Sequence, residues 1–374
     1  MRIAIVRTMP EFSMDVYADG IISGLRTVRP DWEIVEIKPH PVDRKSQSPL
    51  LRIQKIYERL WHFPQQVTQQ KADIFHIIDH SEAHITYWLK KTGKAVVVTC
   101  HDLINFYSRE NLSNSVRLPL ISRGLWIQAI KGMKHADAVI TVSNMTARDT
   151  IKILDIQPAH ISVIPNAVES TFKPLSQEFI DSFRFKYGIS SETICLLNIG
   201  SNHPRKNISR ILETIDILNQ RGLPIHFWKA GADFSDEQKL FIDNQGLQKH
   251  ISYLGKPDKS TLVEIYNAAD VLLAPSLHEG FGITLLEAMA CGTPVITSKV
   301  SAMPEVVGDA GVLVDPNNSQ AIANAVCELQ ANLGYRQELI TKGLARAKQF
   351  TWENTAENIA KVYENLIAKN CKCK

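Results

Sequence analysis

The apolar residues of the chain follow two alternating patterns. Short runs such as Ala95–Cys100 (AVVVTC) are apolar almost throughout, which is typical of strands buried on both faces of a parallel sheet. Between the runs, apolar residues recur every three or four positions, as in Asn207–Gln220, which is typical of amphipathic helices. This alternation predicts doubly wound α/β domains, because right-handed crossovers place helices on both faces of each sheet.

The apolar runs predict strands in both halves of the chain, and a helical pattern follows most of them. The expected strands are Met1–Val6, Trp32–Lys38, Asp73–Ile78, Ala95–Cys100, Ala138–Val142 and Ile161–Ile164, then Thr193–Ile199, Ile225–Lys229, Ile251–Leu254, Val271–Ala274, Pro294–Thr297 and Gly311–Val314.

The alternation is interrupted across residues 166–189, where Pro174 and Gly188, with Pro165 just before them, indicate a connection between domains. We therefore expect two domains, residues 1–170 and 171–351, and 374 residues are enough for two hydrophobic cores. Thr351 is a suitable helix N-cap, and apolar residues continue after it at helical spacing. This terminal helix, residues 352–374, is expected to pack back on the first domain.

Composition excludes some classes of protein. The net charge of +3 does not require a nucleic-acid partner, although it suits an enzyme with anionic substrates. The first residues, MRIAIV, enter a strand directly, and no run reaches the roughly 18 apolar residues of a membrane span. The six cysteines include no CxxC pair, and a metal or disulfide role is not expected for Cys371 and Cys373. A reduced, cytoplasmic protein is the expectation.

The segment Glu279–Glu287 (EGFGITLLE) joins a predicted strand to a predicted helix. Gly280 and Gly282 let backbone N–H groups turn inward ahead of the helix, where amides bind anions such as a diphosphate. Ligands of open α/β sheets bind at the carboxyl ends of strands, where this loop lies. Each glutamate alone could be a solvated side chain, but Glu287 stands in an otherwise apolar helix and needs a partner there.

Two adjacent cations, Arg205 and Lys206, lie between the strand that ends at Gly200 and the next helix. Cations at a helix N-terminus oppose the helix dipole, so an anion between them and the helix would explain their position. Arginine binds phosphate through two donors and lysine as a point charge. A solvated basic turn is the plainer interpretation of an isolated pair.

The pair His101-Asp102 directly follows the strand Ala95–Cys100. A histidine at the carboxyl end of a central strand can donate to a sugar hydroxyl or to a leaving phosphate. A histidine that only caps the sheet edge explains the sequence equally well.

Together these motifs resemble the family-4 retaining glycosyltransferases. Glu279–Glu287 is similar to the two-glutamate motif of that family, and residues 204–207 (Pro-Arg-Lys-Asn) are similar to one form of its donor-phosphate site. Many members also carry a His-Asp pair where His101 and Asp102 stand. The resemblance implies the GT-B fold, in which two Rossmann-like doubly wound domains face a cleft.

The resemblance also implies a role for each matching residue. Glu279 would contact the donor sugar, Glu287 would hold the ribose of the nucleotide, and His101 would lie near the sugar. His101 and Glu279 are thus the expected catalytic residues. The expected donor-binding residues are Arg205, Lys206, Gly280, Phe281, Gly282, Ile283, Thr284, Leu285 and Glu287.

By this resemblance the expected function is retaining transfer of a hexose from a nucleotide-diphosphate sugar to an acceptor hydroxyl. The Pro-Arg-Lys-Asn form looks most like mannosyltransferases or related hexosyltransferases, so GDP-mannose is the first donor expected and a UDP-sugar the second. The acceptor would be a saccharide or a lipid-linked sugar. No Asp-x-Asp pair is placed as a metal ligand, so neither a metal nor another cofactor is expected.

Two other functions fit a pair of Rossmann-like domains. A sugar-nucleotide epimerase of the same fold would consume donor without an acceptor. A nicotinamide-dependent oxidoreductase is less well supported, because no GxGxxG follows the first strand and Leu285 stands where the third glycine of Gly280-Phe-Gly282 should be. A third rival is a non-catalytic scaffold, against which the retained Glu279 and Arg205 argue.

Two basic segments of the first domain carry aromatic residues, Arg44–Trp61 and Arg117–Lys134. Such segments could contact an anionic membrane surface, at the inner face of the membrane, or a lipid-phosphate acceptor. Ordinary amphipathic helices over the sheet explain the same pattern, and we favour that interpretation from sequence.

Overall fold

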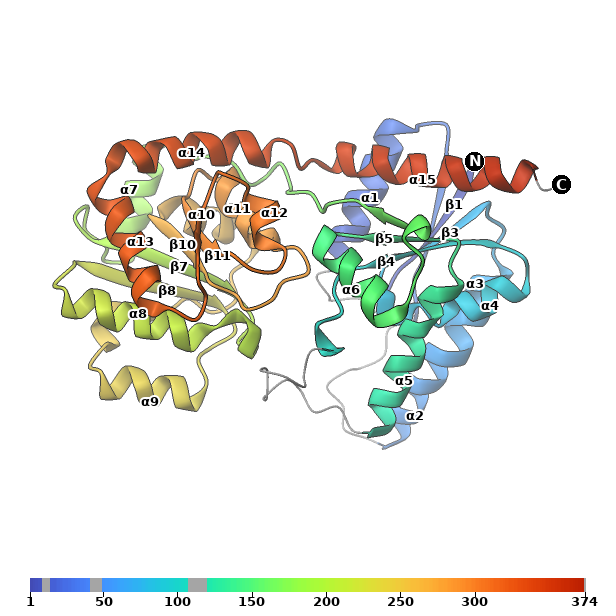
Figure 1. Ribbon diagram of the computed structural model, residues 1–374, viewed down its shortest axis with the longest axis horizontal. Helices are drawn as coiled ribbons and strands as arrows, with labels where there is room; N and C mark the ends of the chain where they lie inside the picture. Colours follow the sequence, from blue (N-terminus) through green and yellow to red (C-terminus); the bar gives the residue numbers. More distant parts are fainter. Residues whose placement is uncertain (9–13, 41–48, 107–119, 373–374) are drawn as a thin grey trace. The chain divides into compact units, whose positions relative to one another are not determined.

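The structure is a computed structural model that describes residues 1–8, 14–40, 49–106 and 120–372 (Figure 1). The chain forms two compact units. The first contains residues 1–106, the described residues of 116–167 and the C-terminal segment from Trp352, and the second contains Val168–Thr351.

The first unit is built on a six-stranded parallel sheet with the strand order β2-β1-β3-β4-β5-β6. Its strands are β1 Arg2–Val6, β2 Glu33–Ile37, β3 Ile74–Ile77, β4 Ala95–Cys100, β5 Ala138–Thr141 and β6 Ile161–Val163. The main helices are α1 Met14–Val28, α2 Pro49–Tyr57, η1 Glu58–His62, α3 Phe63–Gln69, α4 Ile85–Lys91, α5 Leu120–Lys131, α6 Asn144–Leu154 and α15 Trp352–Lys372.

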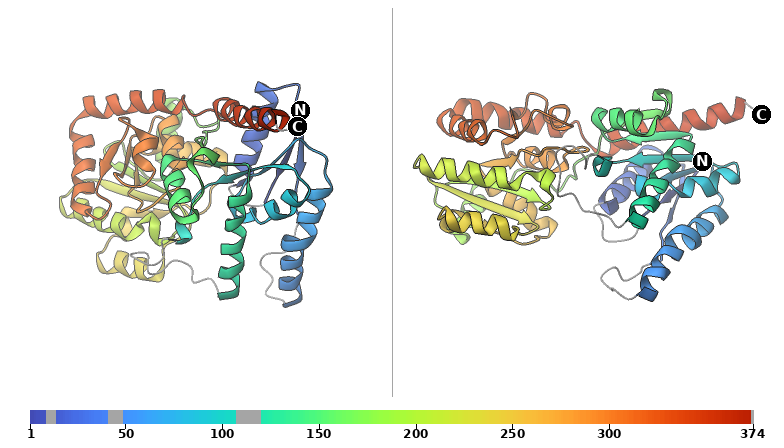
Figure 2. Two further views of the ribbon diagram at one scale, coloured as in Figure 1. Left: turned by 45° about the vertical axis from the view of Figure 1, so that its right-hand side comes forward. Right: turned by 60° about the horizontal axis from the view of Figure 1, so that its bottom comes forward.

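The second unit has its own six-stranded parallel sheet, with the order β12-β11-β10-β7-β8-β9, and Figure 2 shows helices on both faces of it. Its strands are β7 Ile194–Gly200, β8 Ile225–Gly231, β9 Ile251–Tyr253, β10 Val271–Ala274, β11 Val295–Ser298 and β12 Val312–Val314. The helices are α7 Gln177–Lys186, η6 Pro204–Lys206, α8 Ile208–Gln220, α9 Asp236–Asn244, α10 Lys259–Ala268, α11 Ile283–Ala290, α12 Met303–Val307, α13 Ser319–Ala331 and α14 Leu333–Ala347. The predicted doubly wound α/β class is confirmed, and an observed strand lies at each predicted position.

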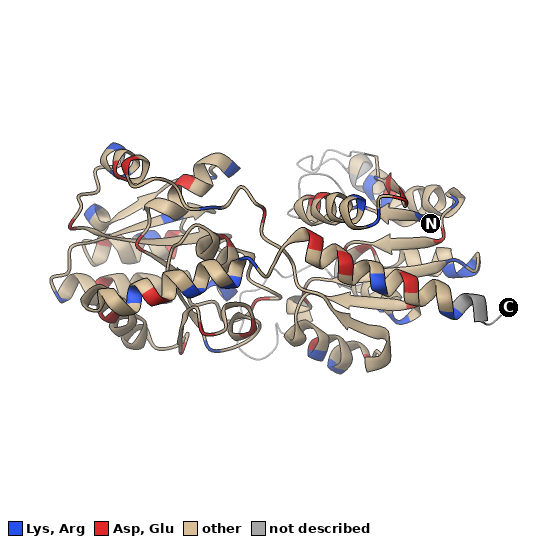
Figure 3. Ribbon diagram, turned by 90° about the horizontal axis from the view of Figure 1, so that it is seen from above, with Lys and Arg blue, Asp and Glu red and all other residues tan. Residues whose placement is uncertain are grey.

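The C-terminal helix α15 belongs to the first unit, where it packs on α1 (Figure 1). Gly20 of α1 makes room for the ring of Trp352, since any larger residue would collide with it. Arg29 donates to Glu357 and to Glu364, each at 2.8 Å, and Figure 3 shows such charged positions spaced along α15. The apolar face of α15 thus completes the core of the first unit.

No described helix has the length and apolar character that a membrane span requires.

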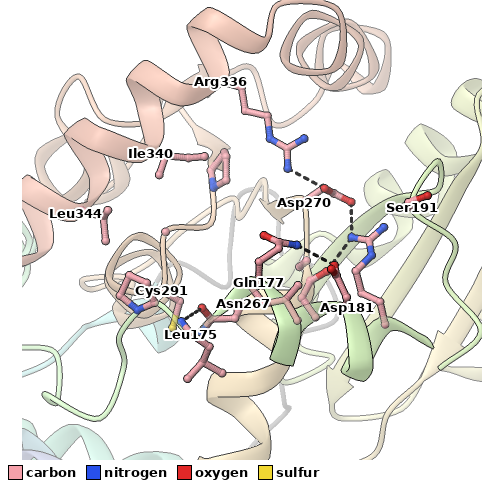
Figure 4. Close-up of a pocket in the computed structure, with 17 residues that line it drawn as sticks. Leu175, Gln177, Asp181, Ser191, Asn267, Asp270, Cys291, Arg336, Ile340 and Leu344 are labelled. Carbon is pink, nitrogen blue, oxygen red and sulfur yellow. Dashed lines mark hydrogen bonds and ion pairs between the residues drawn. The ribbon is translucent and has the colours of Figure 1, made fainter. Parts of the chain in front are cut away.

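A pocket of about 380 Å³ opens in the second unit at the amino ends of β7 and β10 (Figure 4). Asp270 lies in it and accepts from Arg336 at 2.7 Å and from Arg184 at 2.9 Å. It also accepts from the backbone amide of Cys195 at 2.8 Å. Ligands of such sheets bind at the carboxyl ends of the strands, and this cluster lies at the amino ends. We therefore interpret it as a structural ion cluster that links the sheet to α7 and α14.

We expect Asp270→Asn to lower the free energy of unfolding by about 3 kcal/mol, because two partly buried guanidinium groups lose their shared counter-charge. Urea denaturation of the purified chain measures this change. Asp216→Asn on α8, whose carboxylate accepts from exposed Gln220, is the matched control and should change stability by less than about 0.5 kcal/mol. Equal stability of the two variants would contradict the structural role.

Candidate functional site

The strand order of the second unit reverses direction at β7. The chain proceeds from β7 to β8 on one side, whereas β10 lies on the other side of β7. At such a reversal the loops after the two neighbouring strands diverge and leave room for a ligand. Residues 201–207 follow β7 and residues 275–282 follow β10, so the two motifs singled out in the sequence meet at this point.

Hydrogen bonds hold these two loops together. The amide of Leu277 donates to the carbonyl of Arg205 at 2.7 Å. The side chain of Asn207 donates to the carbonyl of Pro275 at 3.0 Å and to that of Pro316 at 2.7 Å. Bonds within the chain thus hold the two loops in place, which lowers the entropic cost of binding a ligand between them.

Where the two loops meet, Glu279 lies between Arg205 and Lys206. The ammonium of Lys206 is 2.7 Å from one carboxylate oxygen, and Arg205 contacts the other. Burial by itself would raise the pKa of Glu279, but the charges of Lys206 and Arg205 outweigh it and lower that pKa to about 2. Two positive charges against one negative charge leave a surplus that suits an anionic ligand.

The cations lie in a separate 3₁₀ turn, η6, rather than in the first turn of α8. Asn207 adopts a left-handed conformation with φ 61° and separates the two elements. The side chain of His203 caps η6 by accepting from the amide of Arg205 at 3.2 Å. This arrangement turns both cations toward the loop after β10, and the sequence pattern did not reveal it.

The loop of Glu279 is fixed from a distant part of the chain. The hydroxyl of Ser301 accepts from the amide of Glu279 at 3.1 Å and donates to its carbonyl at 2.8 Å. Phe281 is buried against Phe350. Gly282, with φ 104°, then starts α11, whose first amides have no acceptor inside the helix. Of the predicted residues 280–285, Phe281 and Leu285 have buried side chains, and the amide of Leu285 already donates to the carbonyl of Gly282 at 3.0 Å.

Glu287 lies further along α11 and has the partner that its apolar surroundings demand. The hydroxyl of Tyr266 donates to it at 2.6 Å. Burial raises the pKa of Glu287 to about 7, although the Tyr266 hydrogen bond acts in the opposite direction. Glu279 is therefore ionised at neutral pH, whereas the raised pKa of Glu287 lies close to neutrality.

Sequence comparison assigns both halves of this chain. The family described as "Glycosyltransferase Family 4" matches residues 17–172, and the family described as "Glycosyl transferases group 1" matches residues 179–346. The chain is a GT-B glycosyltransferase of family 4.

Mannosyltransferases are among its relatives. The glycosyltransferase is 29% identical over 285 residues to O-antigen chain mannosyltransferase B of Escherichia coli, across 75% of this chain and 73% of that protein. It is 27% identical over 307 residues to the serotype-specific mannosyltransferase WbdA of Escherichia coli, across 79% of this chain. The chain spans only 37% of the length of WbdA.

Solved structures share the fold of the glycosyltransferase. Sucrose-phosphate synthase from Thermosynechococcus elongatus matches with a TM-score of 0.79 and 20% identity over 99% of this chain and all of that one. Anabaena HepE in complex with UDP and glucose matches with a TM-score of 0.76 and 16% identity, over 98% and 100% of the two chains. At these identities the likeness establishes the GT-B fold alone.

His101 lies in the first unit of the glycosyltransferase, at the carboxyl end of β4. Its Nε2 donates to the carbonyl of Ile78 at 2.8 Å. The rings of His101 and Tyr17 pack in a T-shaped arrangement, with their centroids 4.6 Å apart. Burial lowers the pKa of His101, which favours a neutral ring whose Nδ1 accepts. His101 is therefore better suited to accept a hydrogen bond from a hydroxyl through Nδ1 than to donate one to a phosphate, which was the other role expected from the sequence. Asp102 instead accepts from the amide of Ile104 at 3.2 Å.

Sequence reasoning missed Lys229, a third cation close to Lys206. Lys229 is fully buried on β8 and donates to the carbonyls of Gly200 and Ala230, each at 2.9 Å. Burial, followed by the charge of Lys206, lowers the pKa of Lys229 to about 8. Lys229 is a lone charged residue in the apolar strand IHFWKAG, just as Glu287 is a lone charged residue in α11. This pattern in the sequence could therefore have identified Lys229 as a candidate.

Proposed function

We propose that this glycosyltransferase moves a hexose, with mannose first among the candidates, from a nucleotide-diphosphate sugar to an acceptor hydroxyl with retention of configuration. The observation that carries the proposal is the buried Glu279, held ionised between Arg205 and Lys206 on two interlocked loops. The names of the mannosyltransferase relatives support mannose, and GDP-mannose is accordingly the first donor to test. The acceptor we propose is a saccharide or a lipid-linked sugar.

In the proposed reaction, the acceptor oxygen forms a bond to the anomeric carbon as the bond from that carbon to the diphosphate oxygen breaks. Arg205, Lys206 and the first amides of α11 would stabilise the charge that develops on the departing diphosphate. These protein donors can take the place of a divalent metal, which is why we propose a metal-independent site. His101 would accept from a hydroxyl of the sugar or of the acceptor.

The low pKa of Glu279 restricts its role. A carboxyl with a pKa of about 2 is almost never protonated near neutral pH, so it is a poor general acid, and as a very weak base it gains little as a proton acceptor. We propose that Glu279 orients the sugar hydroxyls and the two cations. The acceptor proton would then go to the departing diphosphate oxygen on the same face of the sugar.

A donor panel tests the proposal. The full chain is incubated with GDP-mannose, UDP-sugars and ADP-sugars, and we expect one of them to raise its melting temperature because a ligand of the native state stabilises it. That donor is then supplied with saccharide acceptors, and the anomeric configuration of the product is read by NMR. An inverted product would overturn the retaining assignment. Donor consumption without acceptor would favour the epimerase.

Donor binding should depend on the charge of Glu287. Its carboxylate would accept from ribose hydroxyls, so binding favours the ionised form. With a pKa of about 7 in the free chain, donor affinity should rise about tenfold from pH 6 to pH 8 as the ionised fraction grows. Calorimetric titration across this range measures the affinity. Glu287→Gln should flatten the profile, and an unchanged slope in that variant would assign the pH dependence to another group.

We further propose that α2 contacts an anionic membrane surface. Its exposed apolar side chains are Ile53, Ile56 and Tyr57, with exposed fractions of 65%, 50% and 56%, and Trp61 of η1 follows at 55%. Their spacing places them on one face of the helix, and α2 contains no acidic residue. These exposures favour the membrane interpretation over a helix that only covers the sheet.

Vesicle co-sedimentation tests the α2 surface. Combining Ile53→Ser, Ile56→Ser and Trp61→Ser should weaken binding to vesicles rich in anionic phospholipid by about tenfold or more, because apolar area is lost. Leu240→Ser on α9, a side chain that is 61% exposed, is the control. Equal binding of both variants would show that this surface does not contact the membrane.

A further inference from the structure

Three side chains capable of binding a metal converge in the first unit, outside the motifs discussed so far. They are His40, Glu58 and His62, whose candidate ligand atoms all lie within 4.8 Å of one another. Among the described residues this is the only group of three or more such side chains that comes so close. Glu58 and His62 face one another across one turn of η1, and His40 follows the end of β2.

The carboxylate of Glu58 is directed at the two histidines. One oxygen is 2.7 Å from Nδ1 of His62, and the other accepts from the backbone amide of His40 at 3.0 Å. The side chain of Glu58 is 9% exposed, whereas that of His62 is 41% exposed. The group is therefore buried at Glu58 and accessible to solvent at His62. The neighbouring Arg59 points elsewhere, to Glu82 at 3.0 Å.

The chain also restricts the two imidazoles. The rings of His40 and His62 stack at 5.3 Å. His40 stands between Pro39 and Pro41 in the sequence, and a following proline confines the preceding residue to extended conformations. A ligand whose backbone is held in this way loses less entropy when it binds an ion.

Two neutral imidazoles and one carboxylate form a donor set that suits Zn²⁺, whereas Mg²⁺ and Ca²⁺ prefer oxygen ligands throughout. In tetrahedral coordination with bonds of about 2.0–2.2 Å, the ligand atoms lie about 3.3 Å from one another. The ligand atoms of this trio lie within 4.8 Å of one another, so side-chain rotations can bring them to that spacing. We propose that His40, Glu58 and His62 bind one Zn²⁺ ion, with water as the fourth ligand. The ion would link the end of β2 to η1 within the first unit.

The test uses the full chain, stripped with a chelator and dialysed. ZnCl₂ is titrated by calorimetry, and thermal unfolding is recorded with and without Zn²⁺. We expect one ion per chain and a rise in melting temperature that MgCl₂ does not produce. His40→Ala, His62→Ala and Glu58→Gln should each weaken Zn²⁺ binding by about tenfold or more.

Two controls separate this site from other zinc ligands of the chain. His160→Ala removes an exposed histidine at the end of a short helix remote from the trio in sequence, and the double variant Cys371→Ser, Cys373→Ser removes the thiols of the C-terminal CxC. Both should bind Zn²⁺ like the unaltered chain. Unchanged binding after His40→Ala, loss of binding in the cysteine variant, or no binding to the unaltered chain would each overturn the proposal.

Discussion

Lys206→Ala is expected to lower kcat/KM for sugar transfer by about 10²–10³-fold, the usual effect of removing one preorganised donor from a developing negative charge. The ammonium of Lys206 would contact the diphosphate of the donor, so part of the loss should appear as weaker donor binding. It also helps to keep Glu279 ionised, and its removal therefore affects two groups at once. Steady-state kinetics with the donor found in the panel measures the change.

Two control variants make this prediction specific. Lys206→Arg keeps the charge but changes its reach, and should recover only part of the activity because lysine acts as a point charge and arginine as a planar fork. Lys239→Ala on α9 removes an exposed lysine that pairs with Asp233, and should leave kcat/KM unchanged. Activity of Lys206→Ala within threefold of the unaltered enzyme would contradict the proposed role.

The fold could be predicted from the sequence because its strands are short, apolar and β-branched. Runs such as Ala95–Cys100 have no competing helical interpretation, and each predicted run is a strand in the structure. The site was predictable to the extent that it is local. Glu279, Arg205 and Lys206 stand in compact motifs next to strand ends, where the topology of the sheet brings them together.

The contacts that position this site could not be predicted, because they join residues that only the tertiary fold brings together. Ser301 holds the backbone of Glu279 from 22 positions away, and Tyr266 reaches Glu287 across 21 positions. Neither partner belongs to a motif. The left-handed Asn207 was equally hidden, since its conformation follows from the hydrogen bonds that its side chain makes to two other loops.

Glu279→Gln should lower kcat by about 100-fold while donor binding is retained, because the amide keeps the size of the side chain but loses the charge that orients Arg205 and Lys206. Without ligand, the two cations would face one another without a shared anion, and the variant should be less stable by about 3 kcal/mol. A nucleoside diphosphate would supply the missing negative charge. It should therefore raise the melting temperature of Glu279→Gln more than that of the unaltered enzyme.

This opposite response separates Glu279 from its neighbours. Lys206→Ala removes a cation, so a nucleoside diphosphate should stabilise that variant less than the unaltered enzyme, whereas it should stabilise Glu279→Gln more. Thermal unfolding of the three proteins with and without the nucleoside diphosphate gives both comparisons in one experiment. If the diphosphate stabilised Glu279→Gln no more than Lys206→Ala, it would not bind beside these cations, and Glu279 would only neutralise them within a structural ion cluster.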